Sequence, residues 1–322
     1  MDFKTDKEWL VIVNPNAGRK KGIRDWGKIS DLLDHHDFSY YPVFTEYPRH
    51  AIQLSCDLIG KGFKKVIVVG GDGTMNEVVN GLFLQKRYRT TQVILGMVTV
   101  GTGNDWGRMF NIPKDYEQAI LVLKKCQTYV QDAGTVKYMN SDEHFHRYFI
   151  NIAGLGFDAV VTKKTNAQKE KGRSSTLLYF YNIISSLFSY SYADTCISID
   201  GKDYRNKVFS MNVGIGKYNG GGMMQLPAAI ADDGLFDLTI IKKISKPDLI
   251  VSLKRLYNGT IAKHPKVTTY TGKEIRIDSS EKILLETDGE SLGHTPLEFN
   301  IIPKSIRVIT GQPEAIRVQH SA

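Results

Sequence analysis

One stretch decides the fold: Val66-Ile67-Val68-Val69-Gly70-Gly71-Asp72-Gly73-Thr74-Met75-Asn76-Glu77. Its four leading apolar residues are typical of a strand buried on both faces, as in a parallel sheet. The glycines allow the backbone to turn sharply and to come close to a ligand. Beyond Met75 apolar residues recur at helical spacing, so a helix should begin just after the glycines. The stretch therefore predicts a strand, a phosphate-binding loop and a helix whose N-terminal N–H groups suit a phosphate.

Asp72 is the unusual residue of this loop. A carboxylate beside phosphate is repulsive unless a cation lies between them or the acid acts on a proton. Asp72 therefore indicates either magnesium or base chemistry. Taken alone, the glycines and the acid also fit a plain tight turn between a strand and a helix.

Two other loops of the first half follow apolar runs in the same way. Residues 10–13 lead into Asn14-Pro15-Asn16-Ala17-Gly18 and a basic cluster, and residues 93–98 lead into Gly101-Thr102-Gly103-Asn104-Asp105. Each loop alone is also compatible with an ordinary strand-to-helix connection. Strand-like and helical runs alternate up to residue 125, which predicts a doubly wound parallel α/β domain. Since ligands bind at the carboxyl ends of such strands, all three loops should lie at that edge.

The second half changes to short β-like runs separated by turns, which predicts an antiparallel β-sandwich. The runs are residues 148–152, 195–199, 208–213, 235–241, 274–277, 282–286 and 297–301. Two helices should interrupt them, at about residues 174–190 and 247–258. The first is apolar nearly all round, so it is either buried between domains or forms a wall of an acyl-chain pocket or a membrane-facing element. The Gly154-Leu155-Gly156 segment lacks the third glycine of a dinucleotide fingerprint, which argues against NAD binding there.

The overall composition is that of a soluble globular protein, with 42% hydrophobic and 24% charged residues among 322. The net charge of +8 favours anionic partners such as nucleotides, acidic lipid surfaces or nucleic acid. Three widely spaced cysteines fit a reduced, cytoplasmic setting. The charged N-terminus lacks the apolar core of a signal peptide, and residues 177–190 fall short of the roughly 20 that span a bilayer. We therefore expect no transmembrane segment.

Several motifs follow one another in a fixed order from about Trp9 to Ile309. They are Asn14-Pro15-Asn16-Ala17-Gly18, Gly70-Gly71-Asp72-Gly73-Thr74-Met75-Asn76-Glu77, Gly101-Thr102-Gly103-Asn104-Asp105-Trp106, Gly220-Gly221-Gly222-Met223, Pro227-Ala228-Ala229, Asp232-Asp233-Gly234-Leu235-Phe236-Asp237 and Asp288-Gly289-Glu290. Together they resemble the diacylglycerol kinase catalytic family, which includes bacterial diacylglycerol kinases and sphingosine and ceramide kinases. The glycine motif alone is weak, because NAD kinases and phosphofructokinases resemble it. The sequence departs mildly from the family pattern at Gly103, where Ala is frequent, and at Trp106, where Phe is usual.

The resemblance implies ATP-dependent phosphorylation of a lipid hydroxyl. It implies an α/β nucleotide-binding domain of residues 1–131 and 304–322, a β-sandwich lipid-substrate domain of residues 132–303, and ATP in the cleft between them. The residues that would contact ATP are Asn14, Pro15, Asn16, Ala17, Gly18, Thr45, Gly71, Asp72, Gly73, Thr74, Met75, Asn76, Glu77, Thr102, Asn104 and Asp105. Thr45 rests only on its place after the second strand. A structural Mg²⁺ would be held by the Ile230 carbonyl, Asp233 and the Leu235 carbonyl, which are oxygen ligands that suit this cation. Without the resemblance, that segment is compatible with a simple β-turn.

Glu290 matches the general base proposed for the family, and Asp72 is the second expected catalytic residue. The Asp288-Gly289 dipeptide predicts a tight hairpin from which Glu290 projects. The alternative is a turn that merely exposes acids. The implied mechanism has Glu290 accept the proton of the lipid hydroxyl, while Asp72 positions Mg²⁺ through water for in-line transfer.

Two other functions stay open from the sequence. One is a kinase of a soluble acceptor such as NAD, against which stand the apolar helix and the motifs around Asp233 and Glu290. The other is a non-catalytic nucleotide- or lipid-binding regulator, against which stand Asp72, Asn104, Asp105 and Glu290 together. The resemblance implies a membrane-lipid substrate, no nucleic-acid partner, and a peripheral, salt-sensitive contact with an anionic membrane surface at its cytoplasmic, inner face. It leaves a homodimer open.

Overall fold

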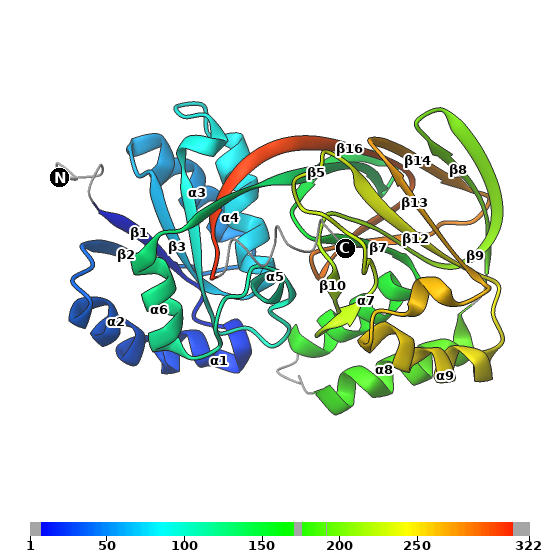
Figure 1. Cartoon of the computed structure of the whole chain (residues 1–322), viewed down its shortest axis with the longest axis horizontal. Coiled ribbons are helices and arrows are strands. Elements are labelled where there is room, and N and C mark those ends of the chain that lie inside the picture. The colour runs from blue at the N-terminus through cyan, green and yellow to red at the C-terminus, as the bar shows by residue number, and fades with distance from the viewer. Residues whose placement is uncertain (1–7, 171–175, 191, 312–322) are drawn as a thin grey trace. The chain divides into compact units, whose positions relative to one another are not determined.

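The computed structural model describes residues 8–170, 176–190 and 192–311, and the chain divides into two units (Figure 1). Unit 1 comprises Met1–Asp132 and Pro303–Ala322, and unit 2 comprises Ala133–Ile302. The chain passes between the units within two strands, β5 (Thr128–Asn140) and β16 (Glu290–Ile309). Residues 312–322 of the predicted α/β domain lie outside the described residues.

Unit 1 is built on a parallel sheet with the strand order β2-β1-β3-β4-β16. The strands are β1 (Trp9–Val13), β2 (Tyr40–Phe44), β3 (Lys65–Gly70), β4 (Ile94–Thr99) and the last residues of β16. The register places Leu10 opposite Val66, Val66 opposite Leu95, and Leu95 opposite Val308. The predicted parallel α/β fold is confirmed for this unit.

Helices cover both faces of this sheet (Figure 1). On one face, α2 (Trp26–His35) and α6 (Tyr116–Lys125) pack against alternate strand residues such as Val11 and Val13. The other face is covered by α3 (His50–Lys61) and α4 (Asp72–Leu84), which contact each other and the sheet. The first helix turn of α4 begins at Asp72 rather than near Met75, because Gly71 is extended and already acts as the N-cap.

Unit 2 is an antiparallel assembly of two layers that share their longest strands. One layer has the strand order β13-β12-β9-β7-β15-β16. The other layer has the strand order β9-β8-β14-β16-β5-β6, so that β9 and β16 take part in both layers. The bounds are β6 (Glu143–Phe149), β7 (Ile152–Gly156), β8 (Ala193–Ile199), β9 (Lys202–Gly214), β12 (Phe236–Lys242), β13 (Val267–Gly272), β14 (Glu274–Ser279) and β15 (Leu284–Thr287). Phe149 stacks on Phe236 between the layers, with ring centroids 5.7 Å apart. The predicted sandwich is confirmed.

Three helices accompany these strands, α7 (Phe157–Glu170), α8 (Thr176–Ser189) and α9 (Lys246–Tyr257). The sequence predicted two helices in this unit, at about residues 174–190 and 247–258. The structure has a further helix, α7, which begins directly after β7, so the prediction missed it. Its first turns contain Val160, Val161 and Thr162, and β-branched residues are weak helix formers. Packing of Phe157 and Val161 into an apolar cluster stabilises the helix instead.

The apolar helix α8 is not buried all round. Ile183 and Leu187 are buried in the cluster that also receives α7, whereas Tyr181 is 65% exposed. In residues 8–170, 176–190 and 192–311, none of the helices combines the length and apolar character needed to cross a bilayer.

Candidate active site

Three glycine-bearing loops of unit 1 come together at the carboxyl ends of β1, β3 and β4. A Cβ atom on Gly101 would lie 2.7 Å from the Cα of Gly71, and one on Gly18 would lie 1.8 Å from the carbonyl oxygen of Val100. Such backbone contacts are open only to residues without a side chain. The predicted convergence of the three loops is therefore present in the structure.

Side-chain hydrogen bonds tie the same loops together. The Asn14 amide Nδ2 donates to the Thr74 hydroxyl at 2.9 Å. The backbone N–H groups of Asp105 and Trp106 donate to the two carboxylate oxygens of Asp72, at 3.0 and 3.1 Å. Asp72 therefore holds the start of the short helix α5 (Asp105–Met109) and is itself fixed in orientation. A role of Asp72 toward Mg²⁺ stays a prediction.

The loop after β1 has an unusual backbone. Gly18, Arg19 and Lys20 lie within the bounds of α1 (Ala17–Arg24), but their φ values of 58°, 60° and 65° are in the left-handed region and interrupt the helix. For the two residues with side chains this conformation costs about 1–2 kcal/mol each. Strain of this kind concentrates at ligand-binding loops. Because Arg19 and Lys20 are also exposed, the loop suits a polyanionic ligand.

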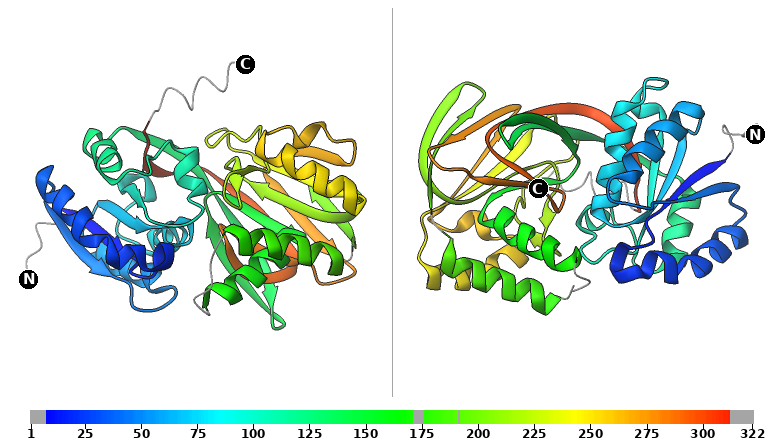
Figure 2. Two further views of the ribbon diagram at one scale, coloured as in Figure 1. Left: turned by 90° about the horizontal axis from the view of Figure 1, so that it is seen from below. Right: turned by 180° about the vertical axis from the view of Figure 1, so that it is seen from behind.

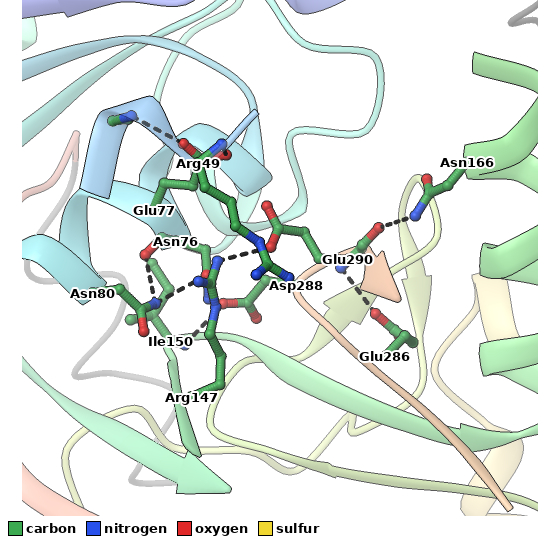
Figure 3. Close-up of polar contacts among 12 residues, drawn as sticks. Arg49, Asn76, Glu77, Asn80, Arg147, Ile150, Asn166, Glu286, Asp288 and Glu290 are labelled. Atoms are coloured by element: carbon green, nitrogen blue, oxygen red, sulfur yellow. Dashed lines mark hydrogen bonds and ion pairs between the residues drawn. The ribbon is translucent and has the colours of Figure 1, made fainter. Parts of the chain in front are cut away.

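Other predicted nucleotide contacts have structural partners that sequence reasoning missed. The two carboxylate oxygens of Glu77 accept the backbone N–H groups of Arg49 and Ala51, at 3.1 and 3.2 Å (Figure 3). Glu77 thereby holds the start of α3 against α4. Met75 and Asn76 are fully buried, so their side chains support the helix from within.

The remaining predicted contacts lie at the same edge of the sheet. Thr45 follows β2 and donates its backbone N–H to the Val13 carbonyl at 2.9 Å. Asn104 adopts a left-handed conformation and its Nδ2 donates to the Gly101 carbonyl at 2.8 Å. Thr102, in the same loop, is exposed. Contacts of all these residues with ATP stay predictions.

In unit 2 the predicted hairpin is present between β15 and β16. Asp288 and Gly289 have φ values of 49° and 85°, and Thr287 pairs with Glu290 across this two-residue turn. The Asp288 carboxylate accepts the backbone N–H groups of Ile150, Asn151 and Ile152 at 3.0–3.1 Å. The turn that carries Glu290 is therefore anchored to the segment between β6 and β7.

Glu290 is paired with an arginine that the sequence did not single out. The Arg147 Nη2 atom donates to the Glu290 Oε2 atom at 2.7 Å, and the two side chains are 7% and 25% exposed (Figure 3). A short contact between charged groups is among the stronger hydrogen bonds in proteins. The sequence contained one indication of this role. Arg147 lies two residues before Phe149 in β6, and residues two apart in a strand face the same side, which here is the buried side.

Two buried carboxyl groups lie behind the hairpin. The oxygens of Glu286 accept the Asn219 Nδ2 and the Gly289 N–H, each at 2.9 Å. Burial, aided by the neighbouring acids, raises the pKa of Glu286 to about 8. Asp158 accepts the Ser210 hydroxyl at 2.5 Å, and burial raises its pKa as well.

An apolar cavity adjoins Asp158. Its walls come from α7, α8, α9 and the neighbouring strands, and its polar lining residues are Asp158, Ser210 and Gln225. Its apolar lining includes Val161, Ile183, Ile184, Leu187, Leu253 and Leu256. The free volume is about 40 Å³, so a ligand larger than a few water molecules enters only when side chains or helices move apart.

The predicted metal-binding segment forms a tight turn in unit 2. Asp233 Oδ1 accepts the Leu235 N–H at 2.9 Å, and Gly234 has a φ of 75°. Burial and the nearby Asp233 raise the pKa of Asp237 to about 7.

Within the described residues no three His, Cys, Asp or Glu side chains are grouped to hold a metal ion. The predicted set of Asp233 with the Ile230 and Leu235 carbonyls supplies oxygen ligands, which suit Mg²⁺, and it stays a prediction.

Comparison with known proteins defines the class of this protein. Residues 8–136 match the family model described as "Diacylglycerol kinase catalytic domain", and residues 151–310 match "YegS C-terminal NAD kinase beta sandwich-like domain". The chain is 31% identical over 314 residues to "Putative lipid kinase YtlR" of Bacillus subtilis, covering 94% of this chain and 99% of the relative. It is 29% identical over 304 residues to a "Diacylglycerol kinase" of Staphylococcus carnosus, covering 94% and 95%. The chain therefore belongs to the diacylglycerol kinase family of lipid kinases, and the predicted resemblance is confirmed.

Solved structures show the same two-part fold. A "putative diacylglycerol kinase" from Bacillus anthracis superposes with a TM-score of 0.75 at 23% identity, covering 96% of this chain and 98% of the other. A yeast NADH kinase complexed with NADH superposes with a TM-score of 0.53 at 14% identity, covering 96% and 85%. At these identities the likeness concerns the fold alone.

Proposed function

We propose that this protein is an ATP-dependent lipid kinase that transfers the γ-phosphate to the hydroxyl of a membrane lipid, diacylglycerol or a sphingoid or related lipid. The observation that carries the proposal is the carboxylate of Glu290, held by Arg147 at 2.7 Å on a hairpin that is anchored through Asp288. A general base must be held at a defined orientation to take a proton in phosphoryl transfer. The names of the relatives, which include diacylglycerol kinases, support a lipid as the acceptor.

ATP would be held by the loops of unit 1. The close approach of Gly71 and Gly101 leaves room for a phosphate chain against the backbone. The N-terminus of α4 and the basic loop of Arg19 and Lys20 favour its negative charge. In this proposal the nucleotide lies in the cleft between the two domains, so that the phosphate and the acceptor hydroxyl meet.

The assignment of the base favours Glu290 over the other acids. Asp288 accepts three backbone N–H groups, and both oxygens of Asp72 accept backbone N–H groups. These carboxylates are committed to holding loops. Glu290 instead contacts a side chain and is one-quarter exposed, which suits a group that must exchange a proton with a substrate.

Magnesium, when bound, would neutralise charge on the transferring phosphate. Asp72 would hold the catalytic ion through water. Asp233 and the Ile230 and Leu235 carbonyls would hold a structural ion. Their oxygen atoms match the preference of this cation.

The cavity between α7, α8 and α9 supports a lipid acceptor. Its walls are apolar, and its polar lining includes the carboxyl group of Asp158, whose pKa is raised by burial. An acyl chain against Val161, Ile183 and Leu187 would leave the polar end of the lipid near Asp158 and Ser210. We propose that the protein meets such lipids as a peripheral protein at the cytoplasmic face of the membrane.

A kinase of NAD or NADH is the second candidate, because the fold is shared with a yeast NADH kinase. The two candidates separate in one assay, in which the purified protein receives labelled ATP with dioleoylglycerol, sphingosine or ceramide in mixed micelles, or with NAD or NADH. Label on a lipid supports the proposal, and label only on NAD or NADH overturns it. If no acceptor is labelled and no ATP is consumed, the protein is a binding protein rather than a kinase.

A further inference from the structure

The carbonyl group of Gly289 directly precedes the proposed base in the chain. The planar peptide group that contains this carbonyl ends at the Cα atom of Glu290, so its orientation restricts the direction in which the Glu290 side chain leaves the turn. Gly289 has a φ of 85°, and a glycine changes its backbone angles at less cost than a residue with a side chain. The peptide group therefore needs a partner if Glu290 is to keep one orientation.

That partner is Asn166, which lies in α7. Its Nδ2 atom donates to the Gly289 carbonyl at 3.0 Å and lies 3.5 Å from the Ser291 hydroxyl oxygen. Figure 3 shows the Asn166 side chain reaching toward the turn beside Glu290. One amide thus contacts both sequence neighbours of Glu290 from a separate element of the fold.

This contact complements the other anchors of the hairpin. Glu286 accepts the Gly289 N–H, and Asp288 accepts three backbone N–H groups. At the far end of the Glu290 side chain, Arg147 donates to the carboxylate. The Gly289 carbonyl lies between these anchored points, and Asn166 holds it.

The place of Asn166 depends on the packing of α7 against α8. The two helices contact each other and lie side by side in Figure 1 and in both views of Figure 2. Between Thr176 and Ser189, α8 contains no charged residue, but it buries the amide of Asn182, which is 2% exposed. Burial of an amide is costly unless the amide is hydrogen-bonded.

Asn182 has its partners on α7, on both sides of Asn166 in the sequence. Its Nδ2 atom donates to the Thr165 hydroxyl at 3.1 Å and to the Gln168 Oε1 atom at 2.7 Å. Its Oδ1 atom accepts the Gln168 Nε2 at 3.1 Å. Sliding α7 along α8 by one turn would break these bonds and leave buried polar groups unpaired. Such a polar contact can fix the register of packed helices, and here it fixes where Asn166 meets the hairpin.

We propose that Asn166 is a positioning residue for the base. It orients Glu290 by holding the Gly289 carbonyl, and the contacts of Asn182 keep it in place. The proposal rests on the proposed function, because it takes Glu290 as the base of the phosphoryl transfer. A residue that acts through the base affects the chemical step rather than the binding of ATP. Loss of Asn166 should therefore lower kcat and leave the KM for ATP unchanged.

Turnover with saturating diacylglycerol in mixed micelles tests this role. Asn166→Leu keeps the approximate size of the side chain and removes the donor, so kcat should fall about 10- to 100-fold, as for a small displacement of a reacting group. Asn166→Gln keeps an amide donor, and its kcat should lie between those of Asn166→Leu and the wild type. The control is Gln85→Met, which removes a side-chain amide that donates to two backbone carbonyls of unit 1, at 2.7 and 3.2 Å. The control should lower thermal stability and leave kcat unchanged.

A double-variant cycle separates positioning from folding. In a Glu290→Gln protein the base is already absent, so adding Asn166→Leu should change kcat by less than about twofold. An equal fall in both backgrounds would overturn the proposal, because Asn166 would then act on folding alone. A wild-type kcat in Asn166→Leu, or the same loss of kcat in the Gln85→Met control, would overturn it as well.

The role of Asn182 is tested by Asn182→Leu combined with Gln168→Met. Both partners become apolar, so neither leaves the other unpaired, and the protein should stay folded. Loss of the register should lower kcat as Asn166→Leu does, and again only when Glu290 is present. A wild-type kcat in this double variant would overturn the role of Asn182.

Hydrogen exchange separates this proposal from the proposed function. In Asn166→Leu the backbone amides of residues 287–291 should exchange faster than in the wild type, while those of unit 1 keep their rates. If the exchange responds in this way but the wild type phosphorylates no lipid, the kinase function fails and the anchoring of the turn by Asn166 stands. If the wild type phosphorylates diacylglycerol and Asn166→Leu changes neither exchange nor kcat, the positioning role fails and the kinase function stands.

Discussion

Replacement of Arg147 by Met should impair catalysis far more than folding. The Arg147 Nη2 atom donates a hydrogen bond to the Glu290 Oε2 atom at 2.7 Å. Methionine retains most of the apolar stem of arginine and removes the guanidinium. The carboxylate of Glu290 would then lose a charged partner that helps to orient it.

The size of the effect follows from the burial of the pair. Hydrogen bonds to charged groups contribute about 1.5–3 kcal/mol, and truncating one partner of a fully buried ion pair costs about 3–5 kcal/mol. Because Glu290 is 25% exposed while Arg147 is 7% exposed, water replaces part of the interaction and the smaller range applies. If that free energy is lost from the transition state, kcat/KM falls about tenfold to a hundredfold.

The assay is kcat/KM for lipid phosphorylation as a function of pH. Without the guanidinium the carboxylate of Glu290 takes up a proton more readily, so the acid limb of the Arg147→Met profile should move to higher pH. Arg147→Lys, which keeps the charge, should lie between the variant and the wild type. Lys137→Met is the matched control, because it removes an exposed ion pair with Glu298 on a neighbouring strand and should change little.

Some outcomes would refute this reasoning. A fall in kcat/KM with an unmoved acid limb and no rescue by Arg147→Lys would mean that Arg147 matters for packing only. Equal effects of Arg147→Met and Lys137→Met would mean that the burial of the pair is irrelevant.

Three further predictions concern other parts of the protein. Gly101→Ala should weaken ATP binding and lower stability, because the new Cβ would lie 2.7 Å from the Cα of Gly71. Gly103→Ala is the control and should keep ATP binding and stability, because its Cβ would have its nearest neighbours at 3.4 Å. ATP titration and thermal unfolding of the two variants test this prediction. Asp72→Asn should leave a folded protein, since one acceptor oxygen remains, but lower kcat by about 10²-fold or more; steady-state rates near wild type would argue against its catalytic role. Glu286 has a pKa near 8 when folded and 4.5 as its ordinary value, so the wild type should lose stability as pH rises from about 5 to 8, by up to about 1.4 kcal/mol per pH unit. Glu286→Gln should reduce that slope in urea unfolding, and parallel slopes would contradict the assignment.

Local patterns predicted a large part of this architecture. The valine run and glycines at residues 66–73 define a strand and a turn by themselves, and the turn dipeptide Asp288-Gly289 defines a hairpin by itself. Motif order along the chain then indicated the family. These features are readable because each depends on residues that are close in sequence.

Other features depend on partners that are distant in sequence. Arg147 and Glu290 are 143 residues apart, and the amides that fix Asp72 lie 33 and 34 residues beyond it. No local pattern reports such pairs. The helix α7 was missed for a related reason, since tertiary packing of Phe157 and Val161 overrides a β-branched sequence.

The central claim is that Glu290 is the base of a lipid kinase. Its most direct test is the single-turnover rate of phosphate transfer from ATP to diacylglycerol by the wild type and by Glu290→Gln, at saturating ATP. The wild type should form the phosphorylated lipid, and the variant should bind ATP with unchanged affinity but react about 10²- to 10⁴-fold more slowly. A Glu290→Gln protein that transfers phosphate at the wild-type rate would contradict the claim.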